Sequence, residues 1–180
     1  MTENTDGLGA DRFVLRPGVT NRYQWMPSDR KRAVPDRIRK VVLARDDYTC
    51  ISCGHRALKW MHIHHVEEED NDDPSNLATL CVACHAVMHT GRSLGFGVIE
   101  IWKSELSQVE IVRATRDGIK HGATLIEINA TFKLKKGRHP PNSVDWANSL
   151  LKRMGPEPRA ELPIPLCAIF VDLKQWQIEQ

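Results

Sequence analysis

The sequence predicts an α+β protein in which a zinc-stapled unit of two strands and a helix follows a basic helix and precedes a second α+β module. Two Cys-x2-Cys pairs predict the stapled unit, because such pairs supply the thiolates of structural zinc sites. A stretch between the pairs that can fold back as a hairpin, and a mixture of helix-type and strand-type apolar periods along the chain, predict the mixed class.

The length and composition are those of a soluble globular protein. The 180 residues suit one or two compact units, with 41% apolar and 27% charged residues. No apolar run approaches the ~20 residues that span a bilayer, so we expect no membrane partner. Residues 1–11 are polar and acidic, unlike a secretory signal or a transit peptide, which leads us to expect a cytoplasmic protein.

The charges are segregated along the chain, although the formal net charge is only +2. Ten basic residues against two acids lie between Arg12 and Arg45, and such a segment can contact nucleic-acid phosphates. Six of the seven residues from Glu67 to Asp73 are acidic, which we interpret as a solvated hairpin tip in preference to metal recruitment or occlusion of a site. The phosphate-binding candidates are Arg37, Arg39, Lys40 and Arg45.

The first half of the chain contains the predicted unit. Residues 1–28 show no sustained periodicity, which predicts a flexible arm without much core of its own. A helix should follow, because Pro35 suits a first helical position and the apolar residues after it keep helical spacing until about Asp47. The remaining predicted elements are extended segments over 48–53, 58–66 and 78–81, and a helix over 82–90 that closes at Gly91.

The second half is predicted as a separate α+β module, with Gly95 and Gly97 as a linker. Residues 126–134 alternate apolar and polar side chains, which is typical of a half-buried strand. The other predicted elements are a helix capped by Ser104 that reaches Lys120, a helix over 143–154 that ends at Gly155, an extended connector over 156–165 and a buried strand over 166–171.

Four of the five cysteines form the pairs Cys50-x2-Cys53 and Cys81-x2-Cys84. Brought together, the pairs supply four thiolates in tetrahedral geometry, which is the usual closed structural zinc site. The alternatives are disulfides, which are disfavoured in an intracellular chain, and unrelated buried thiols, which rarely show two such spacings. Cys167 lies in an apolar run and is interpreted as a core residue. A closed site does no chemistry, so any catalysis must come from other residues.

Five of the eight histidines flank the acidic segment. His85 and His89 are four residues apart on the predicted helix, so their side chains share one face and can bind one metal ion. The second cysteine pair begins that helix and fixes it against the hairpin that carries His64 and His65. His62 shares the strand parity of His64, and we interpret it as an exposed spectator in preference to a group that supports the ligands.

These residues follow the order of a known motif. The motif consists of the run from Arg45 to Gly54 with the first cysteine pair, then His64-His65-Val66, then Ser75-Asn76-Leu77-Ala78-Thr79-Leu80-Cys81-x2-Cys84-His85-x3-His89. The pattern resembles the HNH endonucleases of the ββα-metal fold, including the His, Asn and His that name the family and its frequent structural zinc. The resemblance covers residues 45–89, and residues 93–180 match no family pattern.

The resemblance implies a role for each motif residue. His64, His85 and His89 would hold one divalent ion, either Mg²⁺, Mn²⁺, Ni²⁺ or Zn²⁺, and His65 would be the general base. Asn76 would either orient the base and the hairpin or contribute directly to the metal. The family usually leaves 5′-phosphate and 3′-hydroxyl ends. Adjacent strand residues point to opposite faces, so His64 and His65 would address one phosphate only if the strand twists or bulges there.

We therefore expect a flexible arm over 1–28, an HNH nuclease domain over 29–92 and a C-terminal α+β module of unknown role over 93–180. The expected function is metal-dependent hydrolysis of DNA phosphodiester bonds, with RNA as an open alternative substrate. The rival functions are a non-hydrolytic zinc-dependent nucleic-acid-binding module and a zinc-stapled structural protein. The histidines and Asn76 favour the enzyme, because neither rival needs a base beside a metal pocket. The sequence leaves the oligomeric state open.

Overall fold

A computed structural model of the chain describes residues 13–20, 34–67, 71–154, 157 and 159–173. Within them, the helices are α1 (Asp36–Arg45), α2 (Val82–Met88), α3 (Thr90–Gly95), α4 (Gln108–Lys120), α5 (Leu125–Ala130) and α6 (Val144–Arg153), with a 3-10 turn at Pro74–Asn76. The strands are β1 (Gly18–Thr20), β2 (His62–His65), β3 (Leu77–Leu80), β4 (Ile99–Lys103), β5 (Arg159–Glu161) and β6 (Leu166–Phe170). They pair as three two-stranded antiparallel sheets, β1–β5, β2–β3 and β4–β6.

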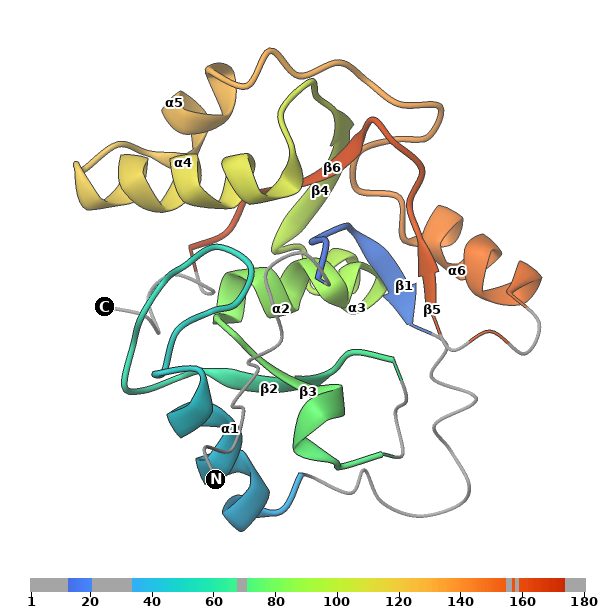
Figure 1. Cartoon of the computed structure of the whole chain (residues 1–180). Helices are drawn as coiled ribbons and strands as arrows, with labels where there is room; N and C mark the ends of the chain where they lie inside the picture. The colour runs from blue at the N-terminus through green and yellow to red at the C-terminus, as the bar shows by residue number, and fades with distance from the viewer. Residues whose placement is uncertain (1–12, 21–33, 68–70, 155–156, 158, 174–180) are drawn as a thin grey trace.

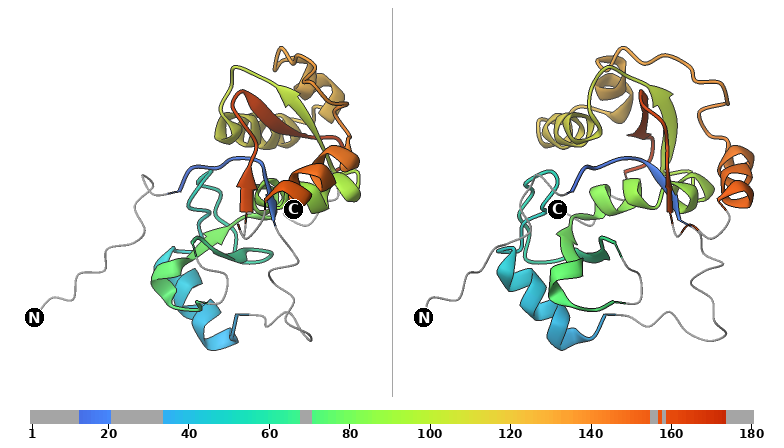
Figure 2. Two further views of the ribbon diagram at one scale, coloured as in Figure 1. Left: turned by 90° about the vertical axis from the view of Figure 1, so that its right-hand side faces the viewer. Right: turned by 45° about the vertical axis from the view of Figure 1, so that its right-hand side comes forward.

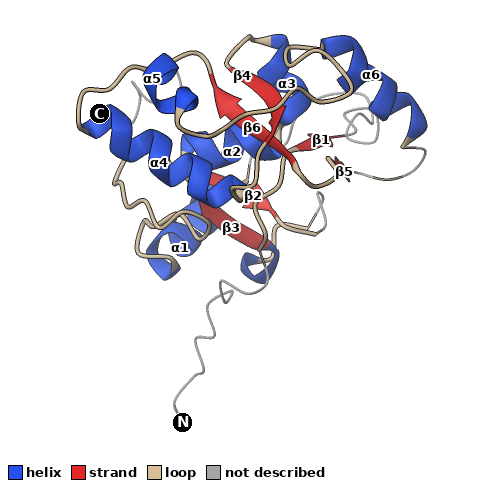
Figure 3. Cartoon of the chain, turned by 90° about the horizontal axis from the view of Figure 1, so that it is seen from above, coloured by secondary structure: helices blue, strands red, loops and turns tan. Residues whose placement is uncertain are grey.

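Helices α2 and α3 run through the middle of the molecule (Figure 1). The β2–β3 hairpin and α1 lie on one side of them, and the β4–β6 pair with α4 lies on the other. The views of Figure 2 show β1 beside β5, and the view from above shows α6 at the edge next to α3 (Figure 3). The α+β class and the unit of two strands and a helix are therefore confirmed.

The β2–β3 hairpin keeps a continuous antiparallel register from its first to its last pair. His64 lies opposite Ala78, and His65 lies opposite Leu77. The strand alternation therefore holds through the histidine pair, with His64 buried and His65 half-buried. All four residues of β3 are buried, because α1 covers one side of the hairpin and α2 the other.

The helix after the second cysteine pair does not close at Gly91 as predicted. It bends at His89 and continues as α3, whose residues Thr90 and Ser93 are buried. Their hydroxyls donate to the carbonyls of Val87 and Ala86, at 2.7 and 2.8 Å, and so satisfy carbonyl groups at the end of α2. Gly91 lies inside α3, where a Cβ would meet Val19 of β1 at an ordinary van der Waals distance of 3.4 Å, so this glycine does not end a helix.

The predicted linker is also wrong. Gly95 is the last residue of α3, and Gly97 has a φ of +65°, the left-handed backbone that glycine adopts most readily. The chain then enters β4 at Ile99. These glycines therefore form a tight connection between two packed elements.

Residues 126–134, predicted as a strand, begin in helix α5. Thr124 and Glu127 form a capping box that starts the helix. Leu125 and Ile128 turn inward, whereas Ile126 is 83% exposed. The alternation of apolar and polar side chains is thus incidental, and the local capping signal determines the structure.

The other C-terminal elements lie close to their predicted places. Helix α4 is capped by Ser107 through a capping box with Glu110, three residues later than predicted, while the Ser104 hydroxyl donates to the carbonyl of Phe132. Ser143 caps α6, and β6 forms where a buried strand was predicted. The extended connector contributes β5. The predicted helix end at Gly155 lies outside the described residues.

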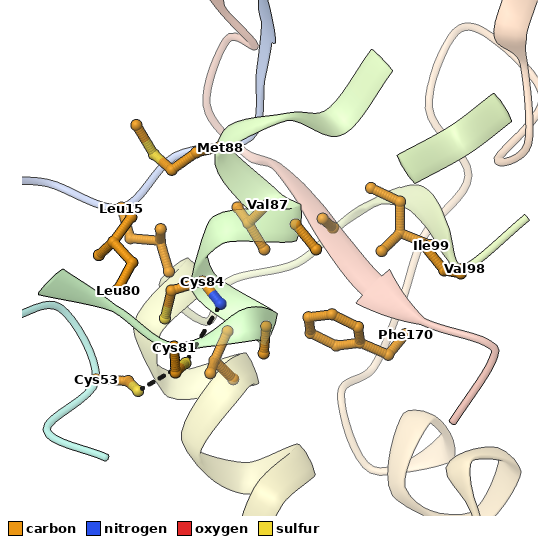
Figure 4. Packing of buried hydrophobic residues seen from close by; sticks show 14 of the residues in the cluster. Leu15, Cys53, Leu80, Cys81, Cys84, Val87, Met88, Val98, Ile99 and Phe170 are labelled. Atoms are coloured by element: carbon orange, nitrogen blue, oxygen red, sulfur yellow. Dashed lines mark hydrogen bonds between the residues drawn. The ribbon is translucent and has the colours of Figure 1, made fainter. Parts of the chain in front are cut away.

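The predicted arm without core is wrong for residues 13–20. Leu15 and Val19 are almost fully buried, and β1 pairs with β5 near the other end of the chain. Both leucine and valine join a large apolar cluster that includes residues of α2, β4 and β6 (Figure 4). The rest of the predicted arm, residues 1–12 and 21–28, lies outside the described residues.

Among the described residues, no helix has both the length and the apolar character needed to cross a membrane.

Candidate functional site

The two cysteine pairs meet in one buried cluster. Cys50 and Cys53 lie in the turn after α1, Cys81 caps the N-terminus of α2, and Cys84 lies in its first turn. All four sulfur atoms lie within 4.8 Å of one another, and none of these cysteines is in a disulfide. The Sγ atoms of Cys53 and Cys81 are 3.6 Å apart (Figure 4). Four converging sulfurs suit a closed structural zinc site.

The electrostatics of the thiols fit a divalent cation. Hydrogen bonds from Cys53 and its neighbours lower the pKa of Cys50, so one thiolate forms readily. Hydrogen bonding to Cys50 and to Cys53 raises the pKa of Cys81 and Cys84 well above the ordinary thiol value, and burial adds to the effect. The raised pKa of Cys81 and Cys84 opposes their ionisation. A bound cation would favour the thiolate form of all four cysteines, because thiols must be deprotonated to bind it.

Two arginines of α4 reach the cysteine cluster from the C-terminal half of the chain. Arg116 donates to the Cys81 sulfur at 3.2 Å, and Arg113 donates to the Cys53 carbonyl at 3.0 Å. The sequence motif ends before α4, so it gave no signal for these contacts. Helix α4 therefore contributes directly to the surroundings of the cysteine cluster.

The three histidines predicted to hold the catalytic ion converge. One ligand atom of each of His64, His85 and His89 lies within 4.8 Å of the others. The ring centroids are 4.5 Å apart for His85–His89, 5.5 Å for His64–His89 and 5.8 Å for His64–His85. His64 comes from β2, His85 from the face of α2, and His89 from the bend after it. Three imidazoles in this arrangement can bind one ion and leave positions for water or substrate.

Burial keeps the imidazoles in the form that binds metal. It lowers the pKa of His64 to about 3, and the neighbouring His89 adds to the shift. Burial also lowers the pKa of His85 well below the ordinary value. Both rings are therefore neutral at neutral pH, and a neutral imidazole offers a lone pair to a cation.

The N-terminal segment covers this histidine cluster. The Thr20 hydroxyl lies 3.0 Å from Nδ1 of His89, and the Phe13 ring packs edge-on against His64 at 6.2 Å between centroids. Because Thr20 occupies Nδ1, Nε2 is the nitrogen of His89 that could bind an ion. Nothing in the sequence indicated either contact, because both join residues far apart in the chain.

His62 belongs to the histidine cluster and is not an exposed spectator. Its ring stacks on that of His85, with centroids 4.3 Å apart and planes 9° from parallel. The shared strand parity with His64 was the signal for this position. His62 can therefore hold the His85 ring in place.

His65 faces the other side of β2 and contacts the acidic loop. Its Nε2 lies 3.0 Å from Oδ1 of Asp72, and both side chains are largely buried. Asp72 comes from the segment Glu67 to Asp73, so this part of the segment is not a plain solvated tip. The predicted general base thus contacts the carboxylate of Asp72, and no sequence pattern indicated this contact.

Asn76 ties the two ends of the acidic loop together. Its Oδ1 accepts from the amide of Glu67 at 3.0 Å, and its Nδ2 donates to the carbonyl of Asn71 at 2.8 Å. The side chain is buried. Between the two roles that the family resemblance allows, these contacts favour orientation of the hairpin.

The four residues predicted to bind phosphate differ in their exposure and in their contacts. Arg37 and Lys40 are exposed on α1, and Arg39 donates to the carbonyl of Met61 at the start of the hairpin. Arg45 contacts Asp46 through two nitrogens, at 2.7 and 2.9 Å. Arg45 also donates to carbonyls that lie at the start of β3 and just before it. The guanidinium of Arg45 therefore connects α1 to the hairpin and is turned away from solvent.

Comparisons with known proteins agree with this geometry. The sequence profile of the HNH endonuclease family matches residues 50–91. A protein of Lactococcus phage SK1 named "Probable HNH endonuclease" is 32% identical over 98 residues, which cover 49% of this chain and 93% of the phage protein. The matched region contains both cysteine pairs, the predicted histidine ligands and Asn76. On these grounds the chain belongs to the HNH endonuclease family.

Proposed function

We propose that the protein is a metal-dependent endonuclease that hydrolyses DNA with one divalent ion held by His64, His85 and His89. The convergence of these three imidazoles within 4.8 Å carries the proposal. When bound, the ion neutralises charge on the scissile phosphate and on the departing oxygen.

His65 is the general base in this proposal, which requires that DNA binding bring its ring to the metal side of β2, because the strand alternation turns it away from His64 in the free protein. It takes a proton from water, the water oxygen bonds to phosphorus, and the bond from phosphorus to the 3′ oxygen breaks. The departing oxygen takes a proton from solvent, which leaves 5′-phosphate and 3′-hydroxyl ends as in the family. Asp72 orients the His65 ring and stabilises the imidazolium that forms, since a carboxylate lies 3.0 Å from Nε2.

The remaining motif residues act as a scaffold. Asn76 fixes the loop that carries Asp72, and the four cysteines hold a structural zinc that joins α2 to the turn after α1. Arg37 and Lys40 contact DNA phosphates through their exposed charges. Arg45 serves the fold, because its donors are engaged within the protein.

The proposal is tested by comparing His65→Ala with His89→Ala on supercoiled plasmid. His65→Ala should fold and bind Ni²⁺ or Mn²⁺ like the wild type, while cleavage falls by ~10²-fold or more, as for loss of a general base. His89→Ala should weaken the metal affinity itself, and its cleavage should partly recover at high metal concentration. Metal affinity by calorimetry and single-turnover cleavage measure the two effects.

His121 provides a matched control, because it is an exposed histidine that follows the last residue of α4. His121→Ala should cleave like the wild type. Wild-type cleavage by His65→Ala would contradict the assigned mechanism. Wild-type DNA binding without cleavage under any of the four metals would instead favour the non-hydrolytic binding module.

A further inference from the structure

A groove lies between α1 and the loop that leads into β2, apart from the histidine cluster. Its cavity of about 490 Å³ is bordered by one face of α1 and by residues 58–60. Leu43, which is largely buried, lines it from the protein side. Figure 1 shows the loop running beside α1 before it enters the hairpin.

The groove carries an excess of positive charge. Arg39, Lys40 and Lys59 line it, and Asp36 is the one acidic side chain among the lining residues. Lys40 and Lys59 are both exposed. The charge suits an anionic ligand, and it lies on the helix that is proposed to contact phosphates.

Large apolar side chains are exposed at the same place. Trp60 is 60% exposed, and Leu58 is 70% exposed. An indole in water is unusual, because tryptophan is among the side chains that gain most from burial. An exposed aromatic ring beside several cations indicates a surface that is covered when a ligand binds.

The backbone holds Trp60 in a strained conformation. Its φ is +64°, in the left-handed region that bulky side chains rarely adopt. The next residue, Met61, is buried, and its carbonyl accepts from Nη2 of Arg39. Such strain persists only where surrounding contacts enforce it, and it clusters at functional sites. These contacts therefore fix the backbone beside Trp60, and the hydrogen bond to Met61 also holds Arg39.

The groove is connected to the metal ligands by a short stretch of chain. Trp60 stands two residues before His62, which stacks on His85, and four residues before His64. Four residues span at most about 14 Å. A few nucleotides cover that distance, at roughly 3.4 Å of rise each.

We propose that this groove binds an unpaired nucleotide of a single-stranded DNA segment, with its base stacked on Trp60 and its phosphates on the groove cations. Aromatic side chains bind bases of single strands by stacking, and every base has a π face. A duplex offers only base edges in its grooves, so it cannot cover the indole in this way. Binding of a single strand in the groove does not depend on the proposed function. Only the conclusion that the bound strand is the strand that is cut rests on it.

The test measures DNA binding by fluorescence anisotropy with the full chain, its structural zinc retained and no other divalent metal added. The probes are a short labelled oligothymidylate and a labelled duplex. Trp60→Ala should weaken binding of the single strand by roughly 5- to 150-fold, as expected for loss of one stacked base. Duplex affinity should change by less than about 2-fold. Trp60→Phe should retain most of the single-strand affinity.

Phe96 is a matched control, because it is an aromatic residue with 64% exposure at the C-terminal end of α3. Phe96→Ala should bind both probes like the wild type. Equal loss of single-strand and duplex affinity in Trp60→Ala, or no loss, would overturn the inference. So would a wild-type dimer in sedimentation that Trp60→Ala converts to a monomer, since the groove would then be a contact between two copies.

Plasmid cleavage separates this inference from the proposed function. If the wild type cleaves with added Mn²⁺ while Trp60→Ala binds single strands normally, the groove assignment fails and the nuclease stands. If Trp60→Ala loses single-strand binding while the wild type cleaves neither single strands nor plasmid with any of the four metals, the nuclease fails and the groove stands.

Discussion

A histidine ligates a metal through one ring nitrogen, and the partner of the other nitrogen fixes the tautomer and the orientation of the ring. For His89 that partner is Thr20, at 3.0 Å from Nδ1. The contact comes from β1, so an N-terminal strand outside the family motif supports a ligand within it. Thr20 is therefore a positioning residue for the proposed metal site.

We predict that Thr20→Val lowers the affinity for Ni²⁺ by about 10- to 100-fold, which is the typical cost of losing such a partner. Thr20→Ser keeps the hydroxyl and should bind Ni²⁺ almost like the wild type. Calorimetric titration of zinc-loaded protein measures both affinities. An unchanged affinity in Thr20→Val, with unchanged thermal unfolding, would show that the hydroxyl does not position His89.

The site residues fall into two groups, according to how far apart in the sequence the contacting residues lie. The clustering of the proposed ligands could be predicted, because Cys-x2-Cys and His-x3-His spacings place side chains together within one turn or one helix face. The contacts of Thr20 and Asp72 could not, since a strand pairing and an irregular loop bring them to the site. The acidic segment was flagged by its composition, but composition does not say which carboxylate turns inward.

At the scale of elements, capping signals proved more informative than apolar alternation. Thr124-x-x-Glu127 satisfies two amide groups at the start of α5, and buried Leu125, Ile128 and Phe132 follow helical spacing. Alternation over 126–134 is equally compatible with a strand, yet the segment begins in α5, and among the described residues its antiparallel bridging to β4 occurs only at Lys135, opposite Lys103. An apolar period therefore predicts a helix or a strand correctly only where the capping residues and the strand partners agree with it.

Helix α1 is the element proposed to contact DNA phosphates. Val42 and Leu43 face the protein, which leaves Arg37 and Lys40 exposed. We predict that Arg37→Ala/Lys40→Ala weakens duplex binding regardless of sequence and reduces the slope of log affinity against log salt by up to about 2, or ~0.9 per lost phosphate contact. Anisotropy titrations over a range of salt concentrations measure the slope.

A double variant on α6, Lys152→Ala/Arg153→Ala, removes the same charge from exposed positions on a helix outside the motif. Its salt slope should match that of the wild type. Equal slopes for the α1 variant and the wild type would assign Arg37 and Lys40 to ordinary solvation.

The larger of two apolar clusters among the described residues spans both halves of the chain. It contains Leu15 from the N-terminal segment, Cys81 and Cys84 from the stapled site, and Phe170 from β6 (Figure 4). The predicted boundary between residues 29–92 and 93–180 falls inside α3, and Arg113 and Arg116 reach the cysteines across it. The division into domains stays a prediction, but the shared cluster implies that the two parts stabilise each other.

We therefore predict that loss of the structural zinc unfolds the entire described fold and not the HNH unit alone. Zinc binding in such sites provides apparent free energies of ~10–16 kcal/mol, which matches or exceeds the ~5–15 kcal/mol that keeps an ordinary domain folded. Cys50→Ser and Cys81→Ser should lose the one zinc per chain, and hydrogen exchange should report lost protection in β4 and β6 as well as in α2.

Cys167→Ser is the matched control, because Cys167 is also buried but donates to the Trp102 carbonyl in a separate apolar cluster. It should keep its zinc and the protection of α2. Persistent protection of β4 and β6 in Cys81→Ser would establish two independent units, and a zinc-free protein with unchanged melting would remove the zinc from the account of stability.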